Sequence, residues 1–231
     1  MIMRSALLAL CLFACTLGCQ SEPLDVAPSV SLSQLQGKWY EIARLPRTTE
    51  TDCHGTTAFY TQAADGSLTL VNQCNVGSAT GKLQTIAMTA TVPDSSVPAK
   101  LALNVGGYTG DYWVLEVGQN YEYAVVGHPS RLYFWILSRT PTLDADVLAG
   151  ILERAKSAHF ETDSLEYTPQ PPAGERNDSS VPQGDVPAPP HAGCAVASSG
   201  AGSGQASLRG LLLLGVAGAA LTRRRRRAAR R

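Results

Sequence analysis

The chain has 231 residues, of which 44% are hydrophobic and 16% charged, and its formal net charge is zero. This balance hides an asymmetry, because seven arginines from Arg223 onward offset an equal excess of acidic residues in the rest of the chain. The acidic remainder argues against nucleic acid as a partner, since binding to a phosphate backbone depends on lysine and arginine.

The first 18 residues have the pattern of a secretory signal peptide. A basic lead ends at Arg4, and the apolar run SALLALCLFACTLG that follows is too short to remain as a membrane helix. The small residue before Cys19 resembles the end of a bacterial lipoprotein signal, which implies lipidation of Cys19. Cys15, which follows LFA, is an alternative lipidation site. We interpret residues 19–30 as a linker to the folded part.

Residues 31–168 have mainly the pattern of β-strands. Alternating runs such as GSLTLVNQC, KLQTIAMTATV, DYWVLEV and YEYAVV are separated by glycine-rich turn sequences. This spacing favours an antiparallel up-and-down sheet, closed as a barrel or folded as a sandwich. In RLYFWILSR both strand faces are apolar, so both are expected to be covered.

One helix is predicted late in the domain, in TLDADVLAGILERAKSAHF. Val147, Ile151 and Ala155 lie on one apolar face, and Thr142 or Asp144 can cap its start. The segment SLEYT then predicts a short last strand. This order of elements predicts an all-β fold: an eight-stranded antiparallel up-and-down barrel with one external C-terminal α-helix. Such a barrel has room for its own side chains or one small ligand.

The C-terminal end has two parts. Residues 169–193 are rich in proline and indicate a semi-rigid linker. Residues 194–231 contain Cys194, the apolar segment GLLLLGVAGAAL and an arginine cluster. The apolar segment is shorter than the ~20 residues that a spanning helix needs. The order of these features resembles the MYXO-CTERM sorting tail, which implies processing at Cys194 and anchoring at the cell envelope.

Two further motifs carry a resemblance to a fold family. GKWYEIARLP, starting at Gly37, matches the G-x-W opening of lipocalins, and GHPSRLYFWILSRTP, residues 127–141, resembles a segment of bacterial outer-membrane lipoprotein lipocalins of the Blc type and of apolipoprotein D. The resemblance covers residues 32–170. It implies that Trp39 closes the narrow end of the barrel, with Arg139 packed over its ring and Gly37 allowing a close approach. A guanidinium over an indole face is a stabilising cation–π pair.

The resemblance also implies a function. It implies a protein of the cell envelope, at the outer membrane or cell surface, held by a lipid anchor or by the tail. This protein would bind and carry a small apolar ligand such as a fatty acid or lysophospholipid, as a monomer or weak dimer without cofactor or metal. The resemblance selects which face of the strands lines the lumen, and so predicts as ligand-binding residues Ala58, Ile86, Met88, Leu101, Leu103, Tyr112, Val114, Ala124, Val126, Tyr133 and Trp135.

Cys53 and Cys74 flank one predicted hairpin. A turn near Asp65 that sets Ala58 opposite Leu70 also sets the two cysteines opposite each other, so we expect a disulfide in an oxidising compartment. Two free thiols, or a metal site with the adjacent His54, are the alternatives. A single neighbouring histidine makes a poor metal site.

The sequence contains no nucleophile or phosphate-binding motif, and we expect no enzymatic activity. Glu41, Glu116 and Glu122 are the carboxylates that strand alternation can turn inward. In a lipocalin-fold enzyme they would perform acid–base chemistry. A structural surface protein, with a barrel filled by its own side chains, is the other alternative.

Overall fold

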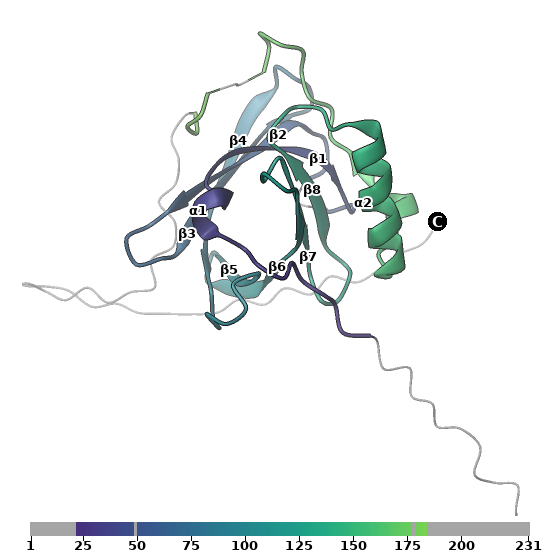
Figure 1. Ribbon diagram of the computed structural model, residues 1–231. Coiled ribbons are helices and arrows are strands. Elements are labelled where there is room, and N and C mark those ends of the chain that lie inside the picture. Colours follow the sequence, from purple (N-terminus) through teal and green to yellow (C-terminus); the bar gives the residue numbers. More distant parts are fainter. Residues whose placement is uncertain (1–21, 49, 177–178, 184–231) are drawn as a thin grey trace, which may run out of the picture. The chain divides into compact units, whose positions relative to one another are not determined.

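The computed structural model describes residues 22–48, 50–176 and 179–183. The predicted signal peptide with Cys15 and Cys19, and the predicted tail with Cys194, lie outside these residues. Eight antiparallel strands within them form a closed barrel, because β1 pairs with both β8 and β2 (Figure 1). The predicted fold class is therefore confirmed. The barrel strands are β1 (Gly37–Arg44), β2 (Cys53–Gln62), β3 (Leu68–Val76), β4 (Lys82–Thr91), β5 (Lys100–Val105), β6 (Tyr108–Val117), β7 (Tyr123–Gly127) and β8 (Phe134–Ser138).

The helix α2 (Ala145–Ser157) lies outside the barrel wall, beside β1, β7 and β8 (Figure 1). Asp144 caps it, because its Oδ1 accepts hydrogen bonds from the backbone N–H groups of Asp146 and Val147 at 2.9 and 3.2 Å. The 3-10 turn η1 (Thr162–Ser164) and the extra strand β9 (Glu166–Tyr167) follow α2. In the described ranges, no helix is both long and apolar enough to cross a membrane.

Apolar side chains form two cores, one on each side of the barrel wall. The strand alternation predicts this, since successive side chains of a strand point to opposite faces. The outer core lies between the wall and α2 and includes Phe134, Ile136, Ile151 and Phe160. The inner core fills the lumen toward the end at which β1 begins and includes Trp39, Leu68, Leu70, Leu101, Val114 and Val126.

Trp39 closes this end of the barrel. Its side chain is fully buried, and its indole N–H donates a hydrogen bond of 2.8 Å to the carbonyl of Leu35 in the one-turn helix α1 (Leu32–Leu35). The guanidinium of Arg139 lies 3.5 Å from the centre of the indole ring and donates to the carbonyl of Lys38 at 2.8 Å. Gly37 has a φ of +95°, which a side chain would strain, and Arg139 lies directly beside it. The closed end is therefore built from both ends of the barrel sequence.

The segment before α1 packs on the barrel, whereas the sequence predicts a linker over residues 19–30. In its described part, Leu24, Ala27 and Val30 are buried. The backbone N–H of Ala27 donates to the carbonyl of Val114 at 3.0 Å. The segment therefore adds apolar contacts to both cores, because Leu24 packs in the outer core and Ala27 and Val30 pack in the inner core.

The β2–β3 hairpin has a different register from the predicted one. Ala58 lies opposite Asn72, and not opposite Leu70. The reason is the turn, in which the N–H of Ala63 bonds to the carbonyl of Ser67 at 2.8 Å, so the hairpin is centred later than expected.

The predicted disulfide between Cys53 and Cys74 is present, with a Cα–Cα distance of 5.4 Å. Cys53 itself lies opposite Val76, two residues beyond Cys74. A bulge in β2 between His54 and Thr57 shifts the register, and the two cysteines meet diagonally across the strands. The bond joins the end of the β1–β2 loop to β3.

We predict that Arg139→Lys lowers the free energy of unfolding by about 2–3 kcal/mol. The arginine also donates to the carbonyls of Gln34 and Tyr121, at 2.7 and 3.3 Å, and an ammonium group cannot reproduce this planar fork. Urea unfolding measures the change. The matched control is Arg154→Lys on the exposed side of α2, where we expect less than about 1 kcal/mol. An equal decrease in the free energy of unfolding in both variants would contradict the role of Arg139 in closing the barrel.

Candidate ligand-binding site

The barrel encloses a cavity of about 360 Å³, within the usual range for small-molecule sites. Its lining includes Arg47 and Glu50 from the β1–β2 loop, so it reaches the end of the barrel opposite Trp39. The lining also includes seven apolar residues: Ala58, Ile86, Met88, Leu103, Val105, Trp135 and Leu137. A cavity of this kind can bury the apolar part of a ligand.

The structure places the predicted lumen residues in three positions. Six of them line the cavity: Ala58, Ile86, Met88, Leu103, Tyr112 and Trp135. Four others belong to the inner core without lining the cavity: Leu101, Val114, Ala124 and Val126. Tyr133 differs from the prediction, because it precedes β8 and is 40% exposed. Its ring stacks on Trp135 with 6.3 Å between centroids, so it lies at the rim rather than inside.

Sequence reasoning missed several lining residues. Tyr60 shares the inward parity of Ala58 and could have been found from alternation. Three others could not have been found in this way. The bulge in β2 places Thr56, the hairpin register places Asn72, and the β1–β2 loop places Arg47. Arg47 lies over the rings of Tyr133 and Trp135, at 5.1 and 5.0 Å from their centres.

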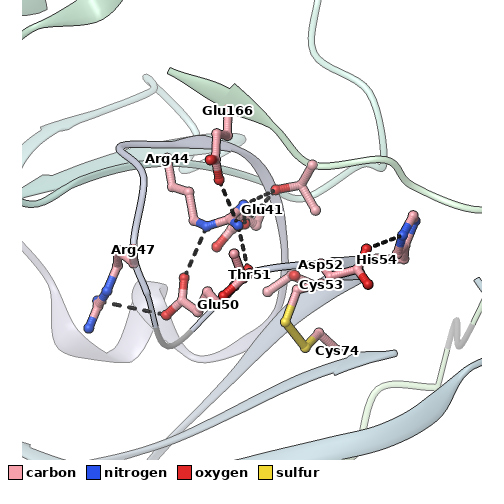
Figure 2. Close-up of a disulfide and its surroundings, with 12 residues drawn as sticks. Glu41, Arg44, Arg47, Glu50, Thr51, Asp52, Cys53, His54, Cys74 and Glu166 are labelled. Atoms are coloured by element: carbon pink, nitrogen blue, oxygen red, sulfur yellow. Dashed lines mark hydrogen bonds and ion pairs between the residues drawn. A yellow bond between two sulfur atoms is a disulfide. The ribbon is translucent and has the colours of Figure 1, made fainter. Parts of the chain in front are cut away.

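Arg44 is buried beside the cavity among three carboxylates (Figure 2). Its guanidinium nitrogens lie 3.3 Å from Glu41, 3.3 Å from Glu50 and 3.0 Å from Glu166. Residues three apart on a regular strand point to opposite faces, but a bulge in β1 between Glu41 and Ala43 turns Arg44 to the side of Glu41. The β1–β2 loop is thereby tied to the barrel wall through Glu50.

Glu41 is the one of the three predicted inward carboxylates that lines the cavity. Burial raises its pKa to about 7, and the nearby charge of Glu50 adds to this, while Thr168 and Arg44 oppose it. Glu116 instead lies outside, where it accepts hydrogen bonds from Arg154 at 2.6 and 2.9 Å. Glu122 accepts from the N–H of Asn120 at 2.8 Å in a turn.

Residues after β9 complete the wall at the cavity. β1 pairs with β2 only as far as Tyr40, and beyond this point the segment that starts at Thr168 fills the gap. The hydroxyl of Thr168 donates to Glu41, and the amide of Gln170 donates to the carbonyls of Glu41 and Thr56 at 2.9 and 3.1 Å. The predicted proline-rich linker, 169–193, therefore begins as part of the barrel.

The same segment continues along the outside of β3. The side chain of Gln73 pairs with the backbone of Gln183, donating to its carbonyl at 2.5 Å and accepting from its N–H at 3.0 Å. The N–H of Gly55 in the β2 bulge bonds to the carbonyl of Pro169 at 2.8 Å. The described part of the expected linker is thus held by backbone hydrogen bonds.

Residues 30–170 match the model of a family described as the lipocalin-like domain. The chain belongs to the lipocalin family. It is 33% identical over 172 residues to the outer membrane lipoprotein Blc of Vibrio cholerae, covering 73% of this chain and 99% of that protein. It is 30% identical over 158 residues to temperature-induced lipocalin-1 of Arabidopsis thaliana, covering 65% of this chain and 85% of that protein.

A solved structure agrees with this lipocalin assignment at the level of the fold. The structure of insecticyanin from the tobacco hornworm Manduca sexta superposes with a TM-score of 0.52 at 22% identity. The match covers 66% of this chain and 88% of insecticyanin. The shared feature is the closed barrel itself.

We predict that Glu41 makes this lipocalin less stable as the pH rises from about 4.5 to about 7. In that window the folded protein keeps the Glu41 proton and the unfolded chain releases it, so the free energy of unfolding falls by roughly 3 kcal/mol in total. Glu41→Gln removes this part of the pH dependence. Urea unfolding of both proteins at pH 5 and pH 7.5 tests it, and parallel pH profiles would contradict it.

Proposed function

We propose that this lipocalin binds and carries a small apolar ligand, of the class of fatty acids or lysophospholipids. The observation that carries the proposal is the cavity, which is lined by apolar side chains, closed at the Trp39 end and lined by loop residues at the other. Transfer of an acyl chain from water into such a cavity gains about 25 cal/mol per Å² of buried apolar surface.

A ligand of this class would place its polar head at the open end. Arg47 lines the cavity there, and its side chain keeps 27% of its surface exposed. A guanidinium is suited to a carboxylate or phosphate group. Glu50 lies 3.7 Å from Arg47, so a bound anionic head group would compete with this ion pair.

The proposal places the protein in the cell envelope. Its relative from Vibrio cholerae is named an outer membrane lipoprotein, and the sequence here has a predicted signal peptide ending before Cys19.

The proposal includes no catalytic step. Glu41, the candidate acid, is engaged by Arg44 and Thr168. Incubation with lipids, followed by mass spectrometry of the products, would reveal turnover if there were any.

We expect Trp135→Ala to weaken the binding of palmitic acid or lysophosphatidylcholine at least tenfold, because the ring lines the cavity and supplies a large apolar contact. Displacement of a fluorescent fatty acid measures the affinity, and native mass spectrometry detects lipid retained during purification.

Trp113→Ala is the matched control for this variant. Trp113 belongs to the outer core, under the ammonium group of Lys100 at 4.3 Å. We expect its affinity to stay within about twofold of the wild type. Equal weakening by both substitutions would place the ligand elsewhere, and a folded wild-type protein that binds neither lipid would contradict the carrier function.

A further inference from the structure

Exposed apolar side chains gather at the open end of the barrel. Because neighbouring strands are antiparallel, the β1–β2, β3–β4, β5–β6 and β7–β8 loops all lie at the end opposite Trp39. We call the large apolar side chains that are exposed in or beside these loops the apolar rim: Val76, Leu83, Tyr108, Leu132 and Tyr133. Among the described residues, no large apolar side chain is exposed in the loops at the Trp39 end. The two ends of the barrel therefore differ in surface chemistry.

Tyr108 stands at the tip of a tight hairpin. The β5–β6 turn consists of Gly106 and Gly107, and both have a positive φ, as this type of two-residue turn requires. Tyr108 follows directly, is 84% exposed and belongs to neither core. A single exposed apolar residue is common on protein surfaces, but a group of them at one end of a barrel indicates a contact surface.

The β7–β8 loop presents Leu132 in a fixed position. The guanidinium of Arg131, the residue before it, donates to the carbonyls of Ala158 and Pro129 at 2.8 and 3.1 Å. Leu132 stays 70% exposed in this loop, and Tyr133 beside it is 40% exposed. Turning Leu132 inward would break hydrogen bonds that tie the loop to the barrel. The fold therefore holds this apolar side chain in water.

The apolar rim is continuous with the lining of the cavity. The ring of Tyr133 stacks on that of Trp135, which lines the cavity. Arg47 also lines the cavity, and its guanidinium lies over the same Tyr133 ring. An apolar molecule that leaves the cavity at this end therefore meets the rim first.

The chain also reaches the barrel at this end. Nη2 of Arg131 donates to the carbonyl of Glu22 at 2.6 Å, and Nε2 of His159 lies 4.0 Å from the Glu22 carboxylate. Glu22, the first described residue, is thus attached to the loop that carries Leu132. Cys19, the predicted lipidation site, is three residues earlier, a chain length of at most about 11 Å. A lipid on Cys19 would therefore keep the open end of the barrel near a bilayer.

The charges in these loops carry both signs. Arg47, Lys82 and Arg131 are positive, and Glu50 and Asp52 are negative. Without a large excess of one sign, this surface has little attraction for charged head groups in particular. Burial of the apolar rim is then the main attraction, and a tyrosine suits a bilayer interface because its ring is apolar and its hydroxyl is polar.

We propose that the open end of the barrel docks on a lipid bilayer, with Tyr108 and Leu132 inserted among the head groups. This docking surface is separate from the carrier function proposed above and does not depend on what the cavity binds. Docking places the cavity mouth on the bilayer, so an apolar ligand can pass between the two without crossing water.

Hydrogen exchange followed by mass spectrometry tests the docking on the full secreted chain, with and without phosphatidylcholine vesicles. We expect amides in residues 105–111 and 128–133 to exchange about threefold or more slowly on the vesicles, because the bilayer shields both loops from water. Amides in residues 92–99, a loop at the Trp39 end, should not change. The measurement is local, so vesicle binding through another part of the chain does not imitate it. Equal protection of both ends, or protection of neither, overturns the inference.

The double variant Tyr108→Gln/Leu132→Gln removes the most exposed part of the apolar rim. We expect the protection of both loops to be lost and the urea midpoint to stay unchanged, because both side chains are exposed. Protection that persists in this variant contradicts the inference.

The matched control adds Ser95→Leu to the double variant. Ser95 is exposed in the β4–β5 loop at the Trp39 end, so the new leucine restores exposed apolar surface at the opposite end. Protection of residues 105–111 and 128–133 should not return. Its return would show that any exposed apolar residue suffices, which also overturns the inference.

The outcomes separate docking from ligand binding. Vesicle protection of the two loops in a protein that binds no fatty acid from solution supports the docking surface and removes the carrier function. Binding of palmitic acid without protection of either loop overturns the docking and leaves the carrier function in place. If the apolar rim serves a protein partner instead, vesicles leave both loops unprotected, which overturns the inference as well.

Discussion

The barrel is organised by one contact, the packing of the Arg139 guanidinium against the indole ring of Trp39. It joins the start of β1 to the residue after β8, and its hydrogen bonds hold the short lead that contains α1. With one end closed by this contact, the interior can open only at the other end. Closure of this end therefore determines where the cavity opens and which loops can contact a ligand.

The second constraint is the incomplete pairing of β1 with β2. At this gap, Thr168, Gln170 and the carboxylates around Arg44 supply hydrogen-bond and ion-pair partners for buried polar groups of the wall. Removing one partner of a buried ion pair leaves an uncompensated charge, so such a cluster favours one arrangement of the wall over others. The polar side of the cavity is therefore a consequence of how the barrel closes, and ligand selection can use groups that the fold already needs.

The sequence was sufficient for the parts that depend on local periodicity and pairwise chemistry. Alternation predicted the strands and which residues share a face, and the resemblance to lipocalins selected the face of Ala58, Met88 and Trp135 as the inner one. The cysteine pairing was predicted although the register was not. The sequence could not predict the bulges in β1 after Glu41 and in β2 after His54, because each involves contacts with a distant segment. For the same reason the residues on both sides of residues 31–168 were interpreted as linkers, although Ala27 and Gln170 are hydrogen-bonded to the barrel.

The late position of β9 and of the residues after it has a consequence for the order of folding. The second half of β1 has no partner nearby in the sequence, since it pairs with β8 and β9. Contacts between residues so far apart form slowly, because the loop between them must first close. A chain that is made available from its N-terminal end would hold half of β1 unpaired until Thr168 and Gln170 were also available. Until then this edge can pair with other chains, so the rate at which the chain is completed, as well as stability, would govern the yield of folded protein.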